Sequence, residues 1–288
     1  MNQLESSGNL IVLVVLCSMT NDRYEIAKRV LDSIKELEND PNYQIIIIDN
    51  GSSMKIPFQE LPLSARYLEM KSNLGYWGIL YWFLFSQQSP IFDYESEYVY
   101  IVESDHVHFN ARLLRDVVIA LNKHTKIVSA RVQEFSVNFR WFYSKSHRLL
   151  PFRVRRSITS LRNAVTGERV KFCRTMDNRD MYLARWHARL PSVSRLSALR
   201  SVFNELSMLE NFTEFDFFRL MRDLSEEVLV LNHGIFFPAS SASNSKKVLS
   251  GSWITNYKGQ FAEYQPTRQS QLNSVVLEQK VMRDSKTH

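Results

Sequence analysis

Four consecutive isoleucines run into a polar turn in the stretch Ile45–Ser52, IIIIDNGS. An unbroken run of β-branched apolar residues predicts a strand that is buried on both faces, as in a parallel sheet. The same pattern returns at residues 98–105, YVYIVESD. Ligands of open α/β sheets bind outside the carboxyl ends of the strands. We therefore expect the two acidic clusters at one edge of a sheet, where they can hold a nucleotide and the metal on its phosphates.

Strand and helix patterns alternate around these two stretches. We expect strands at 10–17, 43–48, 66–70, 97–102 and 126–132, and helices at about 21–37, 76–86 and 110–122. Thr20 or Asn21 can cap the first of these helices. Strands that are separated by helices need crossover connections. The predicted fold class is therefore α/β, with a mostly parallel sheet flanked by helices.

The carboxyl-terminal half carries weaker patterns, because basic, aromatic and turn-forming residues mix after residue 134. We expect strands at Val170–Cys173 and Val228–Leu231, a helix opened by Ser194 or Ser197, and a second helix capped by Thr213. The chain is divided into an α/β half (1–134), an irregular region of the same domain (135–265) and a polar tail (266–288) that ends in a loose helix.

Composition indicates an ordinary globular protein. Of the 288 residues, 44% are hydrophobic and 23% are charged, so a packed core is expected. The two cysteines, Cys17 and Cys173, form neither a disulfide framework nor a zinc site, which favours a reduced, cytoplasmic protein. Cys17 lies in an apolar run, where a buried thiol is expected. The run Leu10–Cys17 is far shorter than the roughly 20 residues that cross a bilayer.

The net charge of +6 is concentrated in one part of the chain. The basic residues between positions 140 and 200 include Lys145, Arg148, Arg153, Arg155, Arg156, Arg162, Arg169, Lys171, Arg174, Arg179, Arg185, Arg189 and Arg195. Such a stretch favours contact with a diphosphate, an acidic lipid surface or nucleic acid, although a solvated face without a partner is an equal alternative. Aromatic residues are sparse after Tyr143, so we expect no nucleic-acid partner.

Glu103 and Asp105 are spaced to share a cation. Carboxylates at positions i and i+2 of an extended segment point the same way. At about 4 Å and an effective dielectric constant near 20, their repulsion would be roughly 4 kcal/mol, which a divalent cation relieves. Mg²⁺ and Mn²⁺ favour oxygen ligands of this kind. The alternative is a polar strand end in which Asp105 caps a turn.

Taken in order, five short motifs resemble the family 2 glycosyltransferases of the GT-A fold. The motifs are the apolar run Leu10–Cys17, Asn21, Asp49-Asn50-Gly51-Ser52, Asn73-Leu74-Gly75 and Glu103-Ser104-Asp105. The resemblance covers residues 10–110 and implies a GT-A-type, Rossmann-like sheet that binds a nucleotide-diphospho-sugar. Residues 135–265 would then form the acceptor side and carry the catalytic base.

The resemblance implies a role for each matching residue. Asp49 would bind the nucleobase, and an Asn or Ser beside it would reach the ribose. Asn21, Asn73 and Ser104 would line the donor pocket, and Gly75 would allow close approach of the backbone.

Three further residues would hold the metal, Mn²⁺ or Mg²⁺, in this resemblance. Glu103 and Asp105 occupy the metal-binding positions, although Glu103 stands where the family usually has Asp. His233 resembles the late histidine that reaches the metal in several GT-A enzymes; a structural histidine is the alternative.

The segment Thr213–Leu220 resembles the family's catalytic-base motif. Glu214 would occupy the base position, usually Asp, and Asp216 the following acidic position. Such a carboxylate removes a proton from the acceptor hydroxyl as the hydroxyl attacks the anomeric carbon. In the alternative interpretation, Thr213 caps a helix and both acids favour its positive end.

The expected function is that of an inverting, metal-dependent glycosyltransferase of the hexosyltransferase type. The donor would be UDP- or GDP-linked and the acceptor a hydroxyl of a saccharide or lipid-linked glycan, as in polysaccharide biosynthesis. The site would be cytoplasmic, with peripheral contact at the inner membrane face left open. The main alternative is a catalytically degenerate GT-A domain that binds a glycan or an anionic surface. A nucleotidyltransferase ranks lower, because the loop Ser18–Asp22 has neither Gly nor Lys.

Overall fold

The computed structural model describes residues 9–104, 106–108, 111–132, 181–184, 192–209, 212–231, 236–238 and 276–281. Within these residues, the main sheet has nine strands in the order β11-β3-β2-β1-β4-β8-β6-β9-β7. Their bounds are β1 Leu10–Leu16, β2 Tyr43–Asp49, β3 Arg66–Met70, β4 Tyr98–Glu103, β6 Ser129–Arg131, β7 Met181–Ala184, β8 Ser192–Arg195, β9 Val228–Leu231 and β11 Val276–Val281.

The centre of the sheet is parallel, as the sequence predicts. β3, β2, β1 and β4 run in one direction, and β6 and β9 run parallel to each other. β8 lies between β4 and β6 and is antiparallel to both. β7 and β11 pair antiparallel at the two edges. This α/β sheet, flanked by helices, confirms the predicted fold class.

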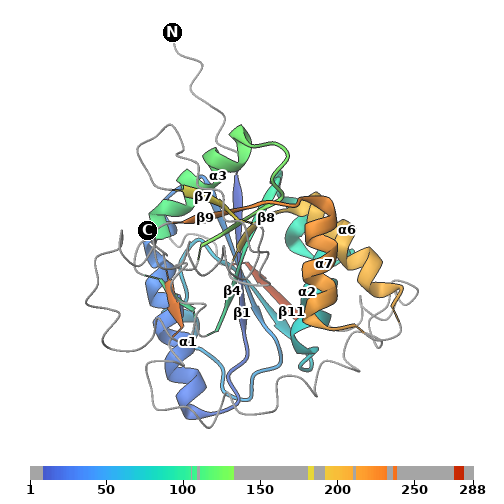
Figure 1. Ribbon diagram of the computed structural model, residues 1–288. Helices are drawn as coiled ribbons and strands as arrows, with labels where there is room; N and C mark the ends of the chain where they lie inside the picture. Colours follow the sequence, from blue (N-terminus) through green and yellow to red (C-terminus); the bar gives the residue numbers. More distant parts are fainter. Residues whose placement is uncertain are drawn as a thin grey trace, which may run out of the picture.

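Two groups of helices cover the sheet, as Figure 1 shows, with α1 and α3 on one side and α2, α6 and α7 on the other. The helices are α1 Asn21–Ile34, α2 Gly75–Phe85, α3 Leu114–Lys123, α6 Leu196–Ser207 and α7 Glu214–Leu224, with short 3-10 turns η1 Lys35–Leu37, η2 Phe58–Glu60, η3 Pro90–Asp93 and η4 Ala111–Leu113. Alternate residues of β1 supply the two cores, because successive side chains of a strand point to opposite faces. Val12 and Val14 pack on the first side, and Ile11 and Leu13 on the second.

Helix α2 is apolar around its whole circumference, with the sequence GYWGILYWFLF. A helix of this kind is buried on all sides, and Trp77, Tyr81 and Trp82 are almost fully enclosed. Among the residues that the structure describes, no helix is long and apolar enough to cross a membrane.

Several predicted elements differ from the structure, some in their boundaries by a few residues and some in their type. α1 ends at Ile34 and continues as a 3-10 turn, and the strand expected at 126–132 covers only Ser129–Arg131. Ser194 does not open a helix, because it pairs with Val99 inside β8. The tail contributes the edge strand β11 where a loose helix was expected, since pairing satisfies the open hydrogen-bonding groups of β3. The strand expected at Val170–Cys173 lies outside the described residues.

A second, two-stranded sheet lies next to the acidic segment. β5 (His106–His108) pairs antiparallel with β10 (Phe236–Pro238), so that Val107 faces Phe237 in the register. This ribbon brings a late part of the chain beside the segment that follows β4.

Candidate functional site

The carboxyl ends of β1, β2 and β4 bring the predicted donor residues to one edge of the sheet. In the register, Leu16 faces Asp49 and Val15 faces Glu103. Asp49 and Glu103 therefore lie on either side of β1, with backbones about 10 Å apart at the usual strand spacing. The sequence prediction that the two acidic clusters share an edge is confirmed by this register.

Asp49 is buried and its carboxylate already accepts from three donors. Oδ1 accepts from the backbone N–H of Ser52 at 2.7 Å, and Oδ2 accepts from the Tyr67 hydroxyl at 3.1 Å. The ammonium of Lys55 lies 3.2 Å from Oδ2 and 2.7 Å from Oε1 of Glu69. A buried carboxylate needs such compensation. The turn after β2 is thus built around the side chain of Asp49.

The electrostatics of this cluster keep its donors protonated. Burial, followed by the charges of Asp49 and Glu69, raises the pKa of Tyr67 well above its ordinary value, so the phenol remains a donor. Burial acts to lower the pKa of Lys55, but the hydrogen bonds and charges of Glu69 and Asp49 outweigh it and the net shift is upward. Lys55 and Tyr67 carried no signal in the sequence, because neither belongs to a motif.

Asn50 ties the turn after β2 to the loop that precedes α2. Its Nδ2 donates to Oδ1 of Asn73 at 3.1 Å and to the carbonyl of Gly75 at 3.2 Å, and its Oδ1 accepts from the N–H of Leu74 at 2.9 Å. Asn73 in turn accepts from the N–H of Gly75 at 2.7 Å. The amide of Asn50 is therefore the hub of two loops that the sequence places 23 residues apart.

Gly51 makes the close approach of these loops feasible. Its φ is +69°, and an added Cβ would lie 2.4 Å from the backbone nitrogen of Asn73. Gly75 also has a φ of +69°, at the start of α2. Only glycine adopts this conformation without strain. The two glycines of the quoted motifs are thus required by the backbone itself.

The loop after β1 completes the edge. Asn73 Nδ2 donates to Cys17 Sγ at 3.1 Å, and the N–H of Ser18 donates to Ser52 Oγ at 2.8 Å. Burial, then the charge of Asp49, raises the pKa of the Cys17 thiol, as expected for an unreactive cysteine. The Ser18 hydroxyl is fully buried and has no partner within the part of the chain that the structure describes. The sequence alone assigns neither the Cys17 thiol nor the Ser18 hydroxyl to the site.

Asn21, predicted to line the donor pocket, is exposed at the first position of α1. Thr20 is the residue that caps this helix, because its Oγ1 accepts from the N–H of Arg23. α1 begins directly after the β1 loop, so Asn21 stands at the same edge as Asp49.

Of the three predicted metal ligands, Glu103 lies in the part of the chain that the structure describes. Glu103 is the last residue of β4 and half-buried, and Ser104 follows it. Asp105 and His233 lie outside the described residues, so their roles stay predictions. Within the described residues no three His, Cys, Asp or Glu side chains lie close enough to hold a metal. The carboxylate of Glu103 is nevertheless the type of oxygen donor that Mg²⁺ or Mn²⁺ binds.

Packing places the first turn of α7 next to the start of α2. The ring of Trp77, in the first turn of α2, lies 5.3 Å from that of Phe212 and 5.5 Å from that of Phe217. Phe212 and Phe217 flank Glu214 and Asp216 in sequence. Because α2 begins at the edge of the sheet that carries Asp49, the two predicted catalytic carboxylates stand near that edge.

The two carboxylates differ in their local roles. Asp216 Oδ2 accepts from the N–H of Thr213 at 2.8 Å and from its hydroxyl at 2.9 Å. The first of these bonds belongs to a capping box, whose second bond runs from the backbone N–H of Asp216 to the side chain of Thr213. These bonds and the charge of Arg219, led by the backbone bond, outweigh burial and lower the pKa of Asp216. Glu214, the first residue of α7, is half-buried and lies outside this box.

No protein-family model matches this chain, and no curated protein matches its sequence. Residues 1–349 of S. aureus TarS align at 14% identity and a TM-score of 0.47, over 81% of this chain and 60% of the TarS chain. A mycobacterial protein aligns at 15% identity and a TM-score of 0.43, over 80% of this chain and 67% of its own. The chain therefore spans less than two thirds of the TarS chain. Likenesses at this level decide neither family nor activity, which rest on the residues of the site.

Proposed function

We propose that the protein is a glycosyltransferase that binds a nucleotide-diphospho-sugar at the carboxyl edge of its sheet. One observation carries the proposal: hydrogen bonds join the turn after β2 to the loop before α2. Only β1 separates this turn from the strand that ends in Glu103. Preorganised loops of this kind hold a ligand at little entropic cost. The donor would lie across the end of β1, between Asp49 and Glu103.

Asp49 would recognise the nucleobase, although most acceptor positions of its carboxylate are already occupied. An ionised carboxylate offers about four acceptor positions, and three donors already occupy Asp49. One position is left for the imide N–H of a base. Asn73 and the backbone of Gly75 would lie against the ribose and diphosphate, with Ser104 and Asn21 at the rim.

A divalent cation fits the acidic segment by the chemistry of its donors. Glu103 and Asp105 would hold it, with His233 as a third ligand, and the cation supplies positive charge to the diphosphate as it departs. The protein's own contribution is to hold the diphosphate beside the carboxylates and to exclude water from the anomeric carbon.

Glu214 is the better candidate for the general base. A base works best when its pKa approaches the operating pH, whereas the capping box lowers the pKa of Asp216. Glu214 would take the proton of the acceptor hydroxyl while the oxygen bonds to the anomeric carbon and the nucleoside diphosphate leaves with the bonding electron pair. Attack from the face opposite the leaving group inverts the anomeric configuration. The acceptor would be a saccharide or lipid-linked glycan at the cytoplasmic side of a membrane.

Two observations favour a second candidate, a GT-A domain that binds a glycan or anionic surface without catalysis. Lys55 neutralises the carboxylate that would recognise the base, and Glu103 replaces the usual Asp of the metal motif. Both features would weaken donor binding.

Calorimetric titration separates the two candidates. UDP and GDP are titrated into the wild type and Asp105→Ala, with and without Mn²⁺. Manganese-dependent binding of one nucleotide, lost in Asp105→Ala, supports the donor site and identifies its base. Absence of binding by every nucleoside diphosphate would overturn the enzymatic proposal in favour of the second candidate.

The role of Glu214 is tested by hydrolysis and transfer from the donor that this titration identifies. Glu214→Gln should lower kcat at least about a hundredfold with little change in donor affinity, the usual range for loss of a general base. Glu205→Gln, on the exposed face of α6, is the matched control and should leave kcat unchanged. Equal activity of Glu214→Gln and wild type would exclude Glu214 as the base.

A further inference from the structure

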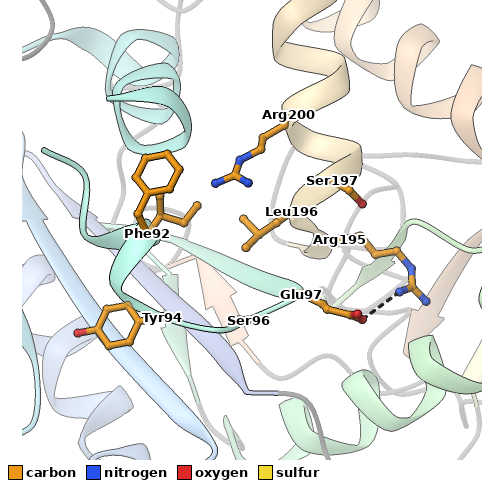
Figure 2. Close-up of a pocket in the computed structure, with 9 residues that line it drawn as sticks. Phe92, Tyr94, Ser96, Glu97, Arg195, Leu196, Ser197 and Arg200 are labelled. Carbon is orange, nitrogen blue, oxygen red and sulfur yellow. Dashed lines mark ion pairs between the residues drawn. The ribbon is translucent and has the colours of Figure 1, made fainter. Parts of the chain in front are cut away.

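A cavity of about 440 Å³ opens at the edge of the sheet opposite the donor site. Its lining comes from η3, the turn before β4, the end of β8 and the first turns of α6, and comprises Ile91, Phe92, Tyr94, Ser96, Glu97, Arg195, Leu196, Ser197 and Arg200. Figure 2 shows these side chains around the hollow. Its volume lies within the range of roughly 300–1,000 Å³ typical of small-molecule sites.

The cavity is separate from the proposed donor site. Glu97 directly precedes β4, whereas Glu103 ends it. Six residues of strand at about 3.3 Å each put roughly 20 Å between the two ends. A ligand in this cavity would therefore not touch the loops around Asp49.

Arg200 supplies a cationic group beside an aromatic wall. Its guanidinium carbon lies 5.2 Å from the ring centroid of Phe92, and Figure 2 shows the side chain directed toward that ring. Phe92 is 56% exposed, so its ring is accessible to a ligand beside Arg200. No carboxylate within the described parts of the chain forms an ion pair with Arg200.

Arg195, on the same rim, makes its contacts within the protein. Its Nε and Nη2 donate to the carbonyls of Ile127 and Leu121 at 3.1 and 2.7 Å, and its guanidinium lies 5.0 Å from the Tyr98 ring centroid. Glu97 approaches its Nη1 only to 3.7 Å and is 75% exposed. Arg195 therefore fixes the rim in place, and Arg200 is the cation that remains available to a ligand.

From this geometry we propose that the cavity binds an anionic saccharide, a sugar ring that carries a phosphate or a carboxylate. Aromatic rings pack against the apolar face of a sugar ring, and an arginine binds a phosphate or carboxylate through two parallel hydrogen bonds. Phe92 provides the first element and Arg200 the second, and Ser197 and Tyr94 also line the cavity. Ile91 and Leu196 provide only a small apolar floor, which disfavours a lipid tail.

The test is a titration, followed by methyl NMR, of glucose 6-phosphate, glucuronate and neutral glucose into the full chain. Both anionic sugars should shift the methyl resonances of Ile91 and Leu196 and leave Val15, at the donor edge, unmoved. Glucose should bind at least about tenfold more weakly, since it lacks the group that pairs with Arg200. A difference between the two anionic sugars identifies which anion the site prefers.

Variants assign the binding to the two side chains. Arg200→Gln should weaken the binding of glucose 6-phosphate about tenfold or more. Arg200→Lys, which keeps the charge but loses the paired N–H donors of the guanidinium, should weaken it by a smaller factor. Phe92→Ser should weaken the sugar phosphate severalfold but leave inorganic phosphate unchanged. Arg222→Gln, an exposed arginine on α7, is the matched control and should change nothing.

Equal affinity for glucose and glucose 6-phosphate would overturn the proposal, and so would full binding in Arg200→Gln and Arg200→Lys. Shifts that appear at Val15 but not at Leu196 would also overturn it, because the sugar would then occupy the donor edge. The outcome does not depend on the nucleotide titrations, which probe that other edge.

Discussion

The turn after β2 and the first turn of α7 each hold an aspartate beside the proposed site, and they hold it in opposite ways. Asp49 is 2% exposed and accepts from a backbone N–H, a phenol and an ammonium. The side chain of Asp216 is 31% exposed and is held by the capping residue of its own helix. The first aspartate organises a buried junction of strands, whereas the second organises one helix end.

This difference predicts where mutations should damage the fold and where they should only loosen it. The turn after β2 bonds to the loops after β1 and before α2, so that a change there propagates to three segments. The cap of α7 joins Thr213 to Asp216 within the first turn of the helix, and the helix is anchored separately by Phe217 against Trp77. Mutations in the first region should therefore lower the free energy of unfolding more than those in the second.

The largest effect is expected from Gly51→Ala. The new Cβ would meet the backbone nitrogen of Asn73 at 2.4 Å, and the φ of +69° disfavours any L-residue. Strain and displacement of a packed backbone together should lower the free energy of unfolding by about 4 kcal/mol. The measurement is the midpoint of urea unfolding at neutral pH.

The control for this variant is Ser53→Ala, two residues further along the same turn and exposed. Its Oγ lies 3.4 Å from the carbonyl of Ser18, a weak hydrogen bond, so the loss should stay within about 0.5 kcal/mol. Equal stability of Gly51→Ala and Ser53→Ala would show that the two loops do not approach as closely as the structure has them.

A smaller but still large effect is expected from Asn50→Ala. The substitution leaves the buried N–H of Leu74 and the carbonyl of Gly75 without their partner. Loss of these bonds should lower the free energy of unfolding by about 2 kcal/mol. The urea midpoint again measures the change, and Asn204→Ala on the exposed face of α6 is the control. Wild-type stability in Asn50→Ala would mean that water replaces the amide, and the junction would then be less buried than Asp49 indicates.

The sequence predicts the central part of this fold because the signals there are local. The isoleucine run of β2 and the apolar run of β1 require burial on both faces, and together they specify parallel strands with helices on each side. Thr213 caps α7 as predicted, since a cap depends only on the next three residues. Register then follows, and it brings Asp49 and Glu103 to one edge.

The sequence does not reveal features that depend on distant partners. β8 has the sequence SVSR, with no apolar run, and becomes a strand because β4 and β6 flank it. Lys55 and Tyr67 reach Asp49 from different segments. The sequence of the turn alone therefore does not show that these two donors already bind the carboxylate. The roles predicted for Asp105 and His233 remain to be tested by mutation.

The smallest effect is expected from Asp216→Ala, and its dependence on pH separates the charge from the packing. The bonds from Thr213 lower the folded-state pKa of Asp216 below the unfolded value, which is about 3.9. The ionised carboxylate therefore contributes stability above that pH, and the contribution is lost as the pH falls through the folded-state pKa. We expect a loss of about 1 kcal/mol at pH 7, as for other helix caps, and convergence of variant and wild type in acid.

Asp223→Ala is the matched control, because Asp223 lies on the same helix near its negative end, where a carboxylate is unfavourable. Its removal should leave stability unchanged or raise it slightly at pH 7. A loss of several kcal/mol in Asp216→Ala would contradict the contrast with Asp49, because the first turn of α7 would then support more than its own helix. A loss that persists at acid pH would show that Asp216 acts through packing, since protonation would already have removed the charge.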